Sequence, residues 1–236
     1  MKIFLFLCLT LIVGVTHPDK NFLLGKFEPA SDVRFSKLRP EHTSGAGTAG
    51  YLRKETYAAF IKMAEAAKAE GVRLVIISAT RNFESQKQIW ENKWNGKVLV
   101  EGKNLTSVKN PEERARIILR YSSMPGSSRH HWGTDMDLNN LENSYFESGS
   151  GLKIYQWLTT HAAEYGFCQP YTSKANGRTG YEEEKWHWSY LPLSQPLLDE
   201  YIKNIRYADI KGFKGCEAAV TVKIIEDYVQ GISCLH

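Results

Sequence analysis

The sequence has little cysteine and no strong excess of either charge. Its 4 Cys among 236 residues are too sparse for a small fold built on disulfides. The 30 Lys and Arg are nearly balanced by 26 Asp and Glu, and a net charge of +4 is too small to indicate a nucleic-acid partner. No repeat or low-complexity tract is present, and aromatic residues (12%) are too plentiful for a disordered chain. We therefore expect a globular protein with one large core or at most two small ones.

One long apolar run stands out, from Ile3 to Val13, directly after Lys2. It is shorter than the roughly 20 residues that cross a bilayer, and it has the length of the apolar part of an export signal. We expect residues 1–16 to be a signal peptide, the protein to be periplasmic or extracellular, and the mature chain to lack a membrane span. A buried N-terminal strand is the alternative.

Cleavage of the signal removes Cys8 and leaves an odd number of cysteines. An odd number in an exported protein allows one disulfide and one free thiol among Cys168, Cys216 and Cys234. Cys216 and Cys234 flank an amphipathic segment, so they are the expected pair, although the sequence leaves the pairing open.

The chain divides into three parts after the signal. Residues 17–50, with several Pro and a stretch of Gly, Ser and Thr, predict an irregular N-terminal arm, and 208–236 predict a C-terminal helical extension. In the main domain, 51–207, helix and strand signals predict helices at 55–70, 83–94, 111–121, 152–165 and 196–206, and strands at 72–78, 136–138 and 186–190. Because regular βαβ alternation is missing, we expect an α+β fold, with a small, mostly antiparallel sheet flanked by helices.

Two segments, 128–137 and 184–188, concentrate imidazoles and carboxylates. Catalytic zinc is commonly held by three nitrogen or oxygen side chains, with water in the fourth position. His130, Asp137 and His187 form such a set, and Glu184 is then a free carboxylate beside the metal. From the residues alone, a metal site and a coincidental cluster are about equally supported.

The spacing sets geometric conditions for that site. His130 and Asp137 are an odd number of residues apart, so a turn at Gly133 must bring them back to one side. For the same reason, Glu184 must lie in a loop before the strand that carries His187.

The other imidazoles and acids near these segments have simpler explanations. His131 should point away from its neighbour His130, as a core residue or as support for the metal site. Asp135 is either a surface carboxylate or an acceptor for a metal ligand. The remaining histidines are expected to be structural or solvated: His17, His42, His161 and His236.

A third segment follows the strand predicted at 72–78. Arg81 comes directly after this strand, where its guanidinium could hold a carboxylate with two hydrogen bonds, and Gln86 lies early in the next helix. The alternative for Arg81 is a structural salt bridge, for example with Glu84.

Together the three segments resemble the D-alanyl-D-alanine carboxypeptidases of vancomycin-resistance type, which are zinc peptidases acting on peptidoglycan stem peptides. The family patterns S-x-x-R-x-x-x-x-Q, S-x-H-x-x-G-x-x-x-D and E-x-W-H match Ser78, Arg81 and Gln86, then Ser128, His130, Gly133 and Asp137, then Glu184, Trp186 and His187. The match covers about residues 50–195. Two positions depart from the family: Lys185, where Pro is frequent, and Asp135, where a small residue is frequent, so Asp135 puts an added negative charge near the substrate subsite.

The resemblance implies a zinc peptidase fold like that of lysostaphin-like enzymes and the Hedgehog signalling domain. It implies Zn²⁺ on His130, Asp137 and His187, Glu184 as catalytic base, and a terminal carboxylate held by three residues: Arg81, Ser128 and Gln86. The expected function is a monomeric D,D-carboxypeptidase that cleaves the terminal D-alanyl-D-alanine bond of stem peptides. Alternatives are an L,D-carboxypeptidase, a D,D-dipeptidase or an endopeptidase on the same peptides, or a non-catalytic zinc- or wall-binding module.

Overall fold

The computed structural model describes residues 19–234, so the predicted signal peptide at 1–16, together with His17 and His236, lies outside the described residues. Six α-helices occur within 19–234: α1 Lys20–Leu23, α2 Lys54–Ala69, α3 Phe83–Trp94, α4 Pro111–Ile118, α5 Gly149–His161 and α6 Leu191–Asn204. The strands of this part of the chain are β1 Phe35–Lys37, β2 Tyr51–Arg53, β3 Ile76–Ser78, β4 Asp135–Leu138, β5 Phe167–Cys168 and β6 His187–Tyr190.

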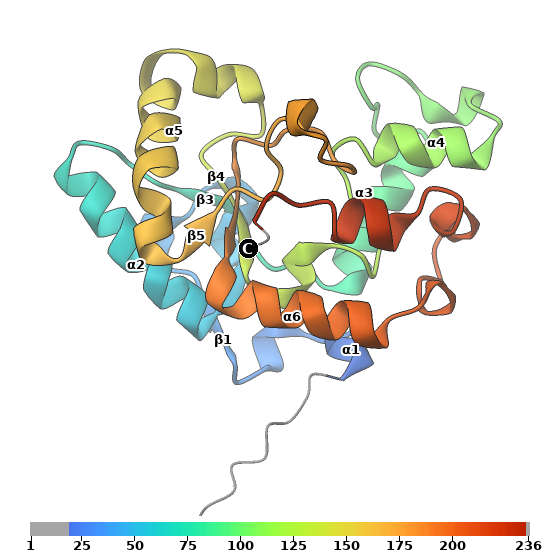
Figure 1. Ribbon diagram of the computed structural model, residues 1–236, viewed down its shortest axis with the longest axis horizontal. Helices are drawn as coiled ribbons and strands as arrows, with labels where there is room; N and C mark the ends of the chain where they lie inside the picture. The colour runs from blue at the N-terminus through green and yellow to red at the C-terminus, as the bar shows by residue number, and fades with distance from the viewer. Residues whose placement is uncertain (1–18, 235–236) are drawn as a thin grey trace, which may run out of the picture.

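The strands form two small sheets. β1 pairs with β2, and the other four strands form an antiparallel sheet in the order β3-β4-β6-β5 (Figure 1). This order places β4 and β6 side by side at the centre, so residues of two segments about fifty positions apart become neighbours. The predicted α+β class with a small antiparallel sheet is confirmed.

Local sequence signals explain most of the helix starts. The Asn82 side chain accepts a hydrogen bond from the Ser85 backbone N–H and begins α3 at the predicted residue. Asn110 caps α4 in the same way, and Pro111 occupies its first turn, where no N–H donor is needed. Strand β3 is shorter than the predicted 72–78, because pairing with β4 is confined to residues 76–78.

The segment predicted as an irregular arm, 17–50, is corrected by the structure. It contains α1 and strand β1, which pairs with β2 from Phe35↔Arg53 to Lys37↔Tyr51. The rings of Phe22, Phe27 and Phe35 pack together, with centroid distances of 5.0–6.5 Å. A three-residue strand has too short a pattern to be seen in the sequence, since only its pairing with a distant segment defines it.

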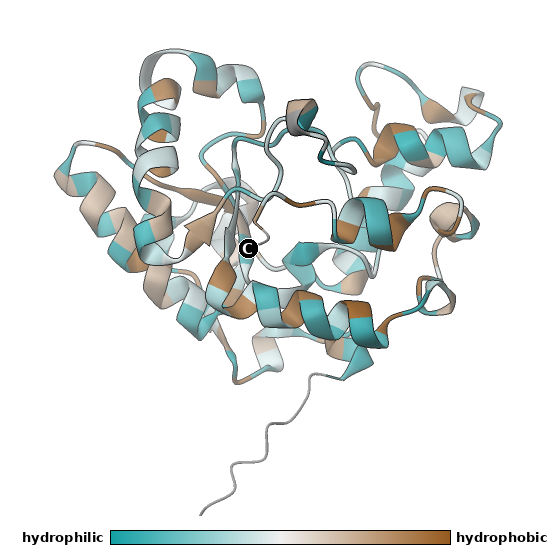
Figure 2. Cartoon of the chain, in the orientation of Figure 1, coloured by the Kyte–Doolittle hydropathy of each residue, from teal (hydrophilic) through white to brown (hydrophobic). Residues whose placement is uncertain are grey.

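Two apolar cores lie on either side of the main sheet. One is formed by α2, α5 and the buried face of the strands, and includes Phe60, Met136 and Trp188. The other joins α3, α4 and α6 to the two chain ends described, from Phe22 to Cys234. Figure 1 shows α2 and α5 on one side, and α3, α4 and the C-terminal segment (residues 208–234) on the other. Figure 2 shows apolar stripes on these helices. None of the helices within 19–234 has the length and apolar character needed to cross a bilayer.

The predicted disulfide pairing is wrong, although the expected count of one disulfide and one free thiol is confirmed. Cys168 bonds Cys234 across a sequence separation of 66, and Cys216 is the free thiol. Cys216 lies in a short 3₁₀ turn, Cys216–Ala219, and a π-helical segment, Ile224–Val229, follows it. The chain then returns to β5, where the Ser233 N–H donates to the Pro170 carbonyl. Because the C-terminal residues return to β5, Cys234 lies beside Cys168 and not beside Cys216, although Cys216 is nearer in sequence.

Candidate functional site

Two strands and one tight turn bring together the three residues predicted as metal ligands. Asp137 on β4 lies directly opposite His187 on β6 in the antiparallel register. His130 belongs to the 3₁₀ turn Arg129–Trp132, which ends at Gly133. Gly133 has a φ of +71°, a conformation that glycine adopts without steric cost, and its turn is the one that the spacing required.

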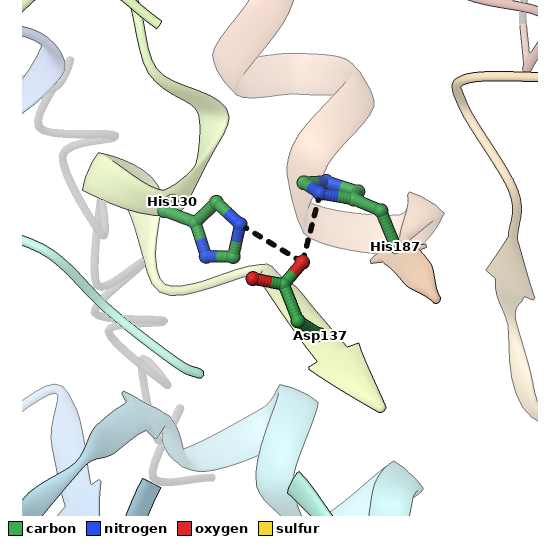
Figure 3. Close-up of side chains that lie close together, drawn as sticks. All are labelled: His130, Asp137 and His187. Carbon is green, nitrogen blue, oxygen red and sulfur yellow. Dashed lines mark ion pairs between the residues drawn. The ribbon is translucent and has the colours of Figure 1, made fainter. Parts of the chain in front are cut away.

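The three side chains face a common point (Figure 3). Their nitrogen and oxygen atoms all lie within 4.8 Å of one another. Asp137 Oδ1 is 3.4 Å from His130 Nε2 and 3.2 Å from His187 Nδ1. Both His130 Nε2 and Asp137 Oδ1 are buried with no hydrogen-bond partner within 19–234. Orphaned buried polar atoms are rare in proteins, so this convergence fits a site that binds a cation, and the donor set suits zinc.

Hydrogen bonds behind the two histidines fix which nitrogen each one presents. His130 Nδ1 donates to the Ala79 carbonyl at 2.9 Å, which leaves the lone pair of Nε2 free. His187 Nε2 donates to Asp135 Oδ2 at 2.9 Å, which leaves Nδ1 free. Metal-binding histidines usually have such partners on their second nitrogen.

Asp135 is the support for His187, one of the two roles considered from the sequence. Besides His187, it accepts from three side chains: Arg129 at 3.0 Å, Thr134 at 2.6 Å and Ser189 at 2.9 Å. Burial alone would raise its pKa, but Arg129 and His187 hold the pKa of Asp135 well below its usual range. Its charge is therefore neutralised behind the ligands, which corrects the expectation of an added charge near the substrate subsite.

Arg129 and Ser189 are residues that the sequence reasoning missed. The Arg129 guanidinium is buried and bonds both Asp135 and the Ser189 hydroxyl. A signal for Ser189 was available: it lies two residues after His187 on a strand and so shares its face.

Glu184 lies in the loop before β6, as the odd spacing required. The His187 backbone N–H donates to the Glu184 carbonyl at 3.2 Å, which folds the loop back over the strand. The Glu184 carboxylate then lies 3.4 Å from His187 Nδ1. Burial raises the pKa of Glu184, and the carboxylates of Asp135, Asp137 and Glu184 raise the pKa of His187 well above its usual range despite its burial. The cluster thus favours positive charge at its centre.

The three predicted carboxylate-binding residues lie beside this cluster. Arg81 contacts Ser78 Oγ at 3.3 Å and Asp137 Oδ2 at 3.9 Å, and its Nε has no partner in the described chain. The salt bridge to Glu84 that we considered is not formed. Gln86 donates from Nε2 to the Ser123 carbonyl, while its buried Oε1 and the buried Ser128 hydroxyl are unpartnered within 19–234.

His131 points away from the cluster and is structural. Its Nδ1 donates to the Arg81 carbonyl at 2.6 Å, and its Nε2 accepts from the Gly126 N–H at 2.9 Å. Burial lowers the pKa of His131 to about 3, so it stays neutral. Gly25 is in contact with the ring, where a Cβ would lie 2.4 Å from Nδ1.

The cluster opens into a cleft of about 690 Å³, whose lining includes Arg81, Lys93, Tyr121, Asp137, Glu184 and Trp186. A much smaller cavity of about 30 Å³ shares Arg81 and Glu184 with the cleft and adds Gln86, Ser128 and His130. The His130–Asp137–His187 cluster, the buried acid and the arginine therefore face one accessible space, where they could act on one substrate.

This combination defines a class, namely small α+β hydrolases whose cleft holds a His-Asp-His cluster next to a buried glutamate. The more specific assignment comes from the sequence: residues 49–193 match the family model of VanY, D-alanyl-D-alanine carboxypeptidase, and the chain belongs to this family.

Individual relatives agree with this assignment. The chain is 30% identical over 206 residues to YodJ of Bacillus subtilis (strain 168), which is assigned as a carboxypeptidase, covering 80% of this chain and 66% of YodJ. It is 28% identical over 129 residues to a D-alanyl-D-alanine carboxypeptidase of Enterococcus faecalis (strain ATCC 700802 / V583), covering 55% of this chain and 44% of that protein. The chain thus spans less than two thirds of either relative.

Solved structures share the fold. A zinc complex of a mutant of the vancomycin-resistance D,D-pentapeptidase VanY matches with a TM-score of 0.52 and 21% identity, over 80% of this chain and 92% of that one. VanYB in complex with D-alanine-D-alanine gives 0.51 and 21%, over 75% and 93% of the two chains. The LD-carboxypeptidase LdcB gives 0.51 and 21%, over 86% and 81%.

Proposed function

We propose that this protein is a zinc-dependent carboxypeptidase that removes the terminal D-alanine from peptidoglycan stem peptides ending in D-alanyl-D-alanine. The observation that carries the proposal is the meeting of the His130–Asp137–His187 cluster with Glu184 and Arg81 in one cleft. Family membership supports the reaction, and the zinc and D-alanine-D-alanine named for the VanY structures support the metal and substrate.

His130 Nε2, Asp137 and His187 Nδ1 would hold the metal. A zinc ion there supplies Lewis acidity, which polarises a carbonyl and lowers the pKa of water towards ~7. The hydrogen bonds from His130 to Ala79 and from His187 to Asp135 keep both rings oriented without movement. The metal ligands are thus preorganised by the fold.

Glu184 is proposed as the general base and acid. Its carboxylate accepts a proton from the attacking water and then delivers it to the leaving amine. The raised pKa of this buried carboxyl suits both tasks, because a very weak base would not accept the proton.

Arg81 and Ser128 are proposed to bind the terminal carboxylate of the substrate. Gln86 is proposed to line the pocket beside it, because its Nε2 donates to the Ser123 carbonyl and its free Oε1 can only accept. The unpartnered Ser128 hydroxyl and Arg81 Nε have donors to offer, and all three residues line the small cavity beside the cluster. Anchoring the terminus there would place the last peptide bond over the metal, which restricts cleavage to the chain end.

The central test replaces Glu184 by Gln, which keeps the size and removes the base. We expect hydrolysis to fall by about 10²–10⁴-fold, with about one zinc per chain retained by metal analysis. Glu183→Gln is the matched control, because this neighbour does not line the cleft. Full activity of the Glu184→Gln variant would remove Glu184 as the base.

The bond that is cleaved can be read from product masses. Mass spectrometry of muropeptides, with and without a chelator, should show loss of one D-alanine from pentapeptides. Loss of the terminal residue from tetrapeptides would assign an L,D-carboxypeptidase, release of a dipeptide a D,D-dipeptidase, and internal cleavage an endopeptidase. Zinc binding without any product would assign a binding module.

We also propose that the protein acts after export, in the periplasm or outside the cell. The Cys168–Cys234 disulfide supports this, since such bonds persist in oxidising compartments. Fractionation of cells, with detection of the processed N-terminus, tests the proposal.

A further inference from the structure

Lys93 lines the cleft but takes no part in the function proposed above. It lies near the end of α3, outside the three segments that carry the family resemblance. Its amine donates to Ser122 Oγ at 2.5 Å, and it makes no ion pair with any residue in 19–234. An ammonium group has three donors, so its bonding capacity is largely unused.

The surroundings of Lys93 disfavour an unpaired charge. Burial is the main cause that lowers its pKa, the positive charge of Arg81 lowers it further, and the negative charge of Glu184 opposes both only in part. A partly desolvated cation without a carboxylate is costly, unless a ligand supplies one. Among the described residues that line the cleft, Glu142 also has no ion-pair partner. Its side chain is exposed, and an ion pair between exposed groups would add little to the binding energy of a ligand.

The position of Lys93 separates it from the proposed terminal-carboxylate pocket. Arg81, Gln86 and Ser128 line the small cavity of about 30 Å³, and Lys93 does not. Lys93 lines the large cleft instead, together with Tyr121 and Trp186, whose ring centroids are 6.2 Å apart. A peptide whose last residue occupies the small cavity would therefore extend into the space that Lys93 faces.

We propose that Lys93 is a specificity residue that binds a second carboxylate of the substrate, carried by a residue upstream of the cleaved bond. The preferred substrates are then peptides with two free carboxylates, one at the terminus and one on an upstream side chain. This inference rests on the proposed function for the orientation of the peptide.

The test uses pairs of synthetic pentapeptides that end in D-alanyl-D-alanine. The members of each pair differ only by Glu or Gln at one of the three preceding positions, so size is kept and charge is changed. We expect the wild-type, zinc-loaded enzyme to prefer one Glu peptide by about tenfold or more in kcat/KM, as a hydrogen bond to a charged group allows. Lys93→Met should abolish this preference through a larger loss of kcat/KM on the Glu peptide than on the Gln peptide, and Lys93→Arg should retain it.

Lys87→Met is the matched control, because Lys87 lies on the same helix and does not line the cleft. Equal rates for Glu and Gln peptides at every position in the wild type would overturn the proposal, whether or not the variant folds. An equal loss on both peptides in Lys93→Met would also overturn it, since Lys93 would then act on the terminus or on the fold.

Calorimetry on zinc-loaded Glu184→Gln protein separates this proposal from the reaction itself. We expect the same preference for a Glu peptide in the binding affinity, and its loss when Lys93→Met is added. If the wild type cleaves no peptide but this preference is measured, the proposed function fails and the Lys93 site stands. If the wild type cleaves the peptides and binding shows no preference, the proposed function stands and the Lys93 site fails.

Discussion

The two sides of the His130–Asp137–His187 cluster are built in opposite ways. Behind the ligands, Asp135 is saturated by four donors and the second nitrogen of each histidine has a partner. On the cleft side, unpartnered atoms gather, including Gln86 Oε1 and Ser128 Oγ. Behind the ligands most polar atoms are paired, with Arg129 Nη1 an exception, whereas unpartnered atoms gather on the cleft side. Substitutions on the two sides should therefore change different quantities.

The C-terminal segment belongs to the supporting side. The rings of Tyr228, Tyr181, Tyr171 and His187 follow one another with centroid distances of 5.1, 4.9 and 4.7 Å. The Arg178 side chain bonds the carbonyls of Thr172, Thr179, Tyr181 and Gly231, and so fastens the segment to the loop before β6. The last described residues thus lie behind His187, a proposed metal ligand, and belong to the domain.

The largest expected effect on stability comes from removing the disulfide of this segment. For the closed loop, with its sequence separation of 66, replacing both Cys168 and Cys234 by Ser should lower the free energy of unfolding by ~4 kcal/mol. Urea titration measures this loss, with Cys216→Ser expected to stay within about 0.5 kcal/mol of the wild type. Zinc affinity of the folded double variant should be nearly unchanged, because Asp135 still holds His187.

A large loss of zinc affinity in the folded double variant would contradict this division. The C-terminal segment would then position the metal ligand directly, through its ring contacts, instead of stabilising the fold around it.

The residues of the cluster could be predicted from the sequence better than the contacts that support them. The turn at Gly133 and the loop position of Glu184 were predictable from short spacing. The set His130, Asp137 and His187 was predictable only with the family resemblance, because from residue types alone a coincidental cluster was equally supported. The Asn82 cap likewise predicted the start of α3. These signals act over a few residues, and the structure brings the predicted cluster together.

The supporting contacts were largely hidden, because they join distant segments. The pairing of Cys168 with Cys234 depends on the return of the C-terminal segment to β5, a strand of only two residues. The role of Asp135 depends on β6 lying beside β4 with Ser189 opposite it. Lys93 had no motif, and only its place in the cleft distinguishes it from an ordinary surface lysine.

An intermediate effect is expected when the support of His187 is weakened. Asp135→Asn keeps the side-chain shape but loses the charge that orients His187 Nε2–H, so zinc affinity should fall by roughly 10–100-fold. Competition with a chromophoric chelator measures the affinity. Because Arg129 would then be buried without its charged partner, the double variant Arg129→Gln/Asp135→Asn separates the lost support of His187 from the cost of an unpaired buried charge.

The Asp135 variants should differ from Glu184→Gln in their response to added zinc. With saturating zinc, kcat should recover in large part, whereas Glu184→Gln should stay inactive at any zinc concentration. An unchanged affinity in both Asp135 variants would show that the contact to His187 does not support the metal.

The smallest effect concerns acid stability and His131. Both ring nitrogens are satisfied only in the neutral form, because Nε2 must accept from Gly126 while Nδ1 donates to Arg81. The pKa of His131 is about 3 in the folded protein, against about 6.5 when unfolded. Between these values the unfolded state binds more protons, so His131 makes folding less favourable as the pH falls below 6.5. From pH 7 to pH 5.5 this amounts to about 1 kcal/mol.

The measurement is urea unfolding at several pH values with chelator present, so that metal release does not add to the slope. His131→Gln keeps a polar side chain and removes the titration, and its stability should fall less steeply over this pH range than that of the wild type. The groups of the metal cluster titrate in both proteins, so the difference in slope reports His131 alone. Parallel slopes would mean that His131 accepts a proton in the folded state, and the supporting side would then be less rigid than its hydrogen bonds indicate.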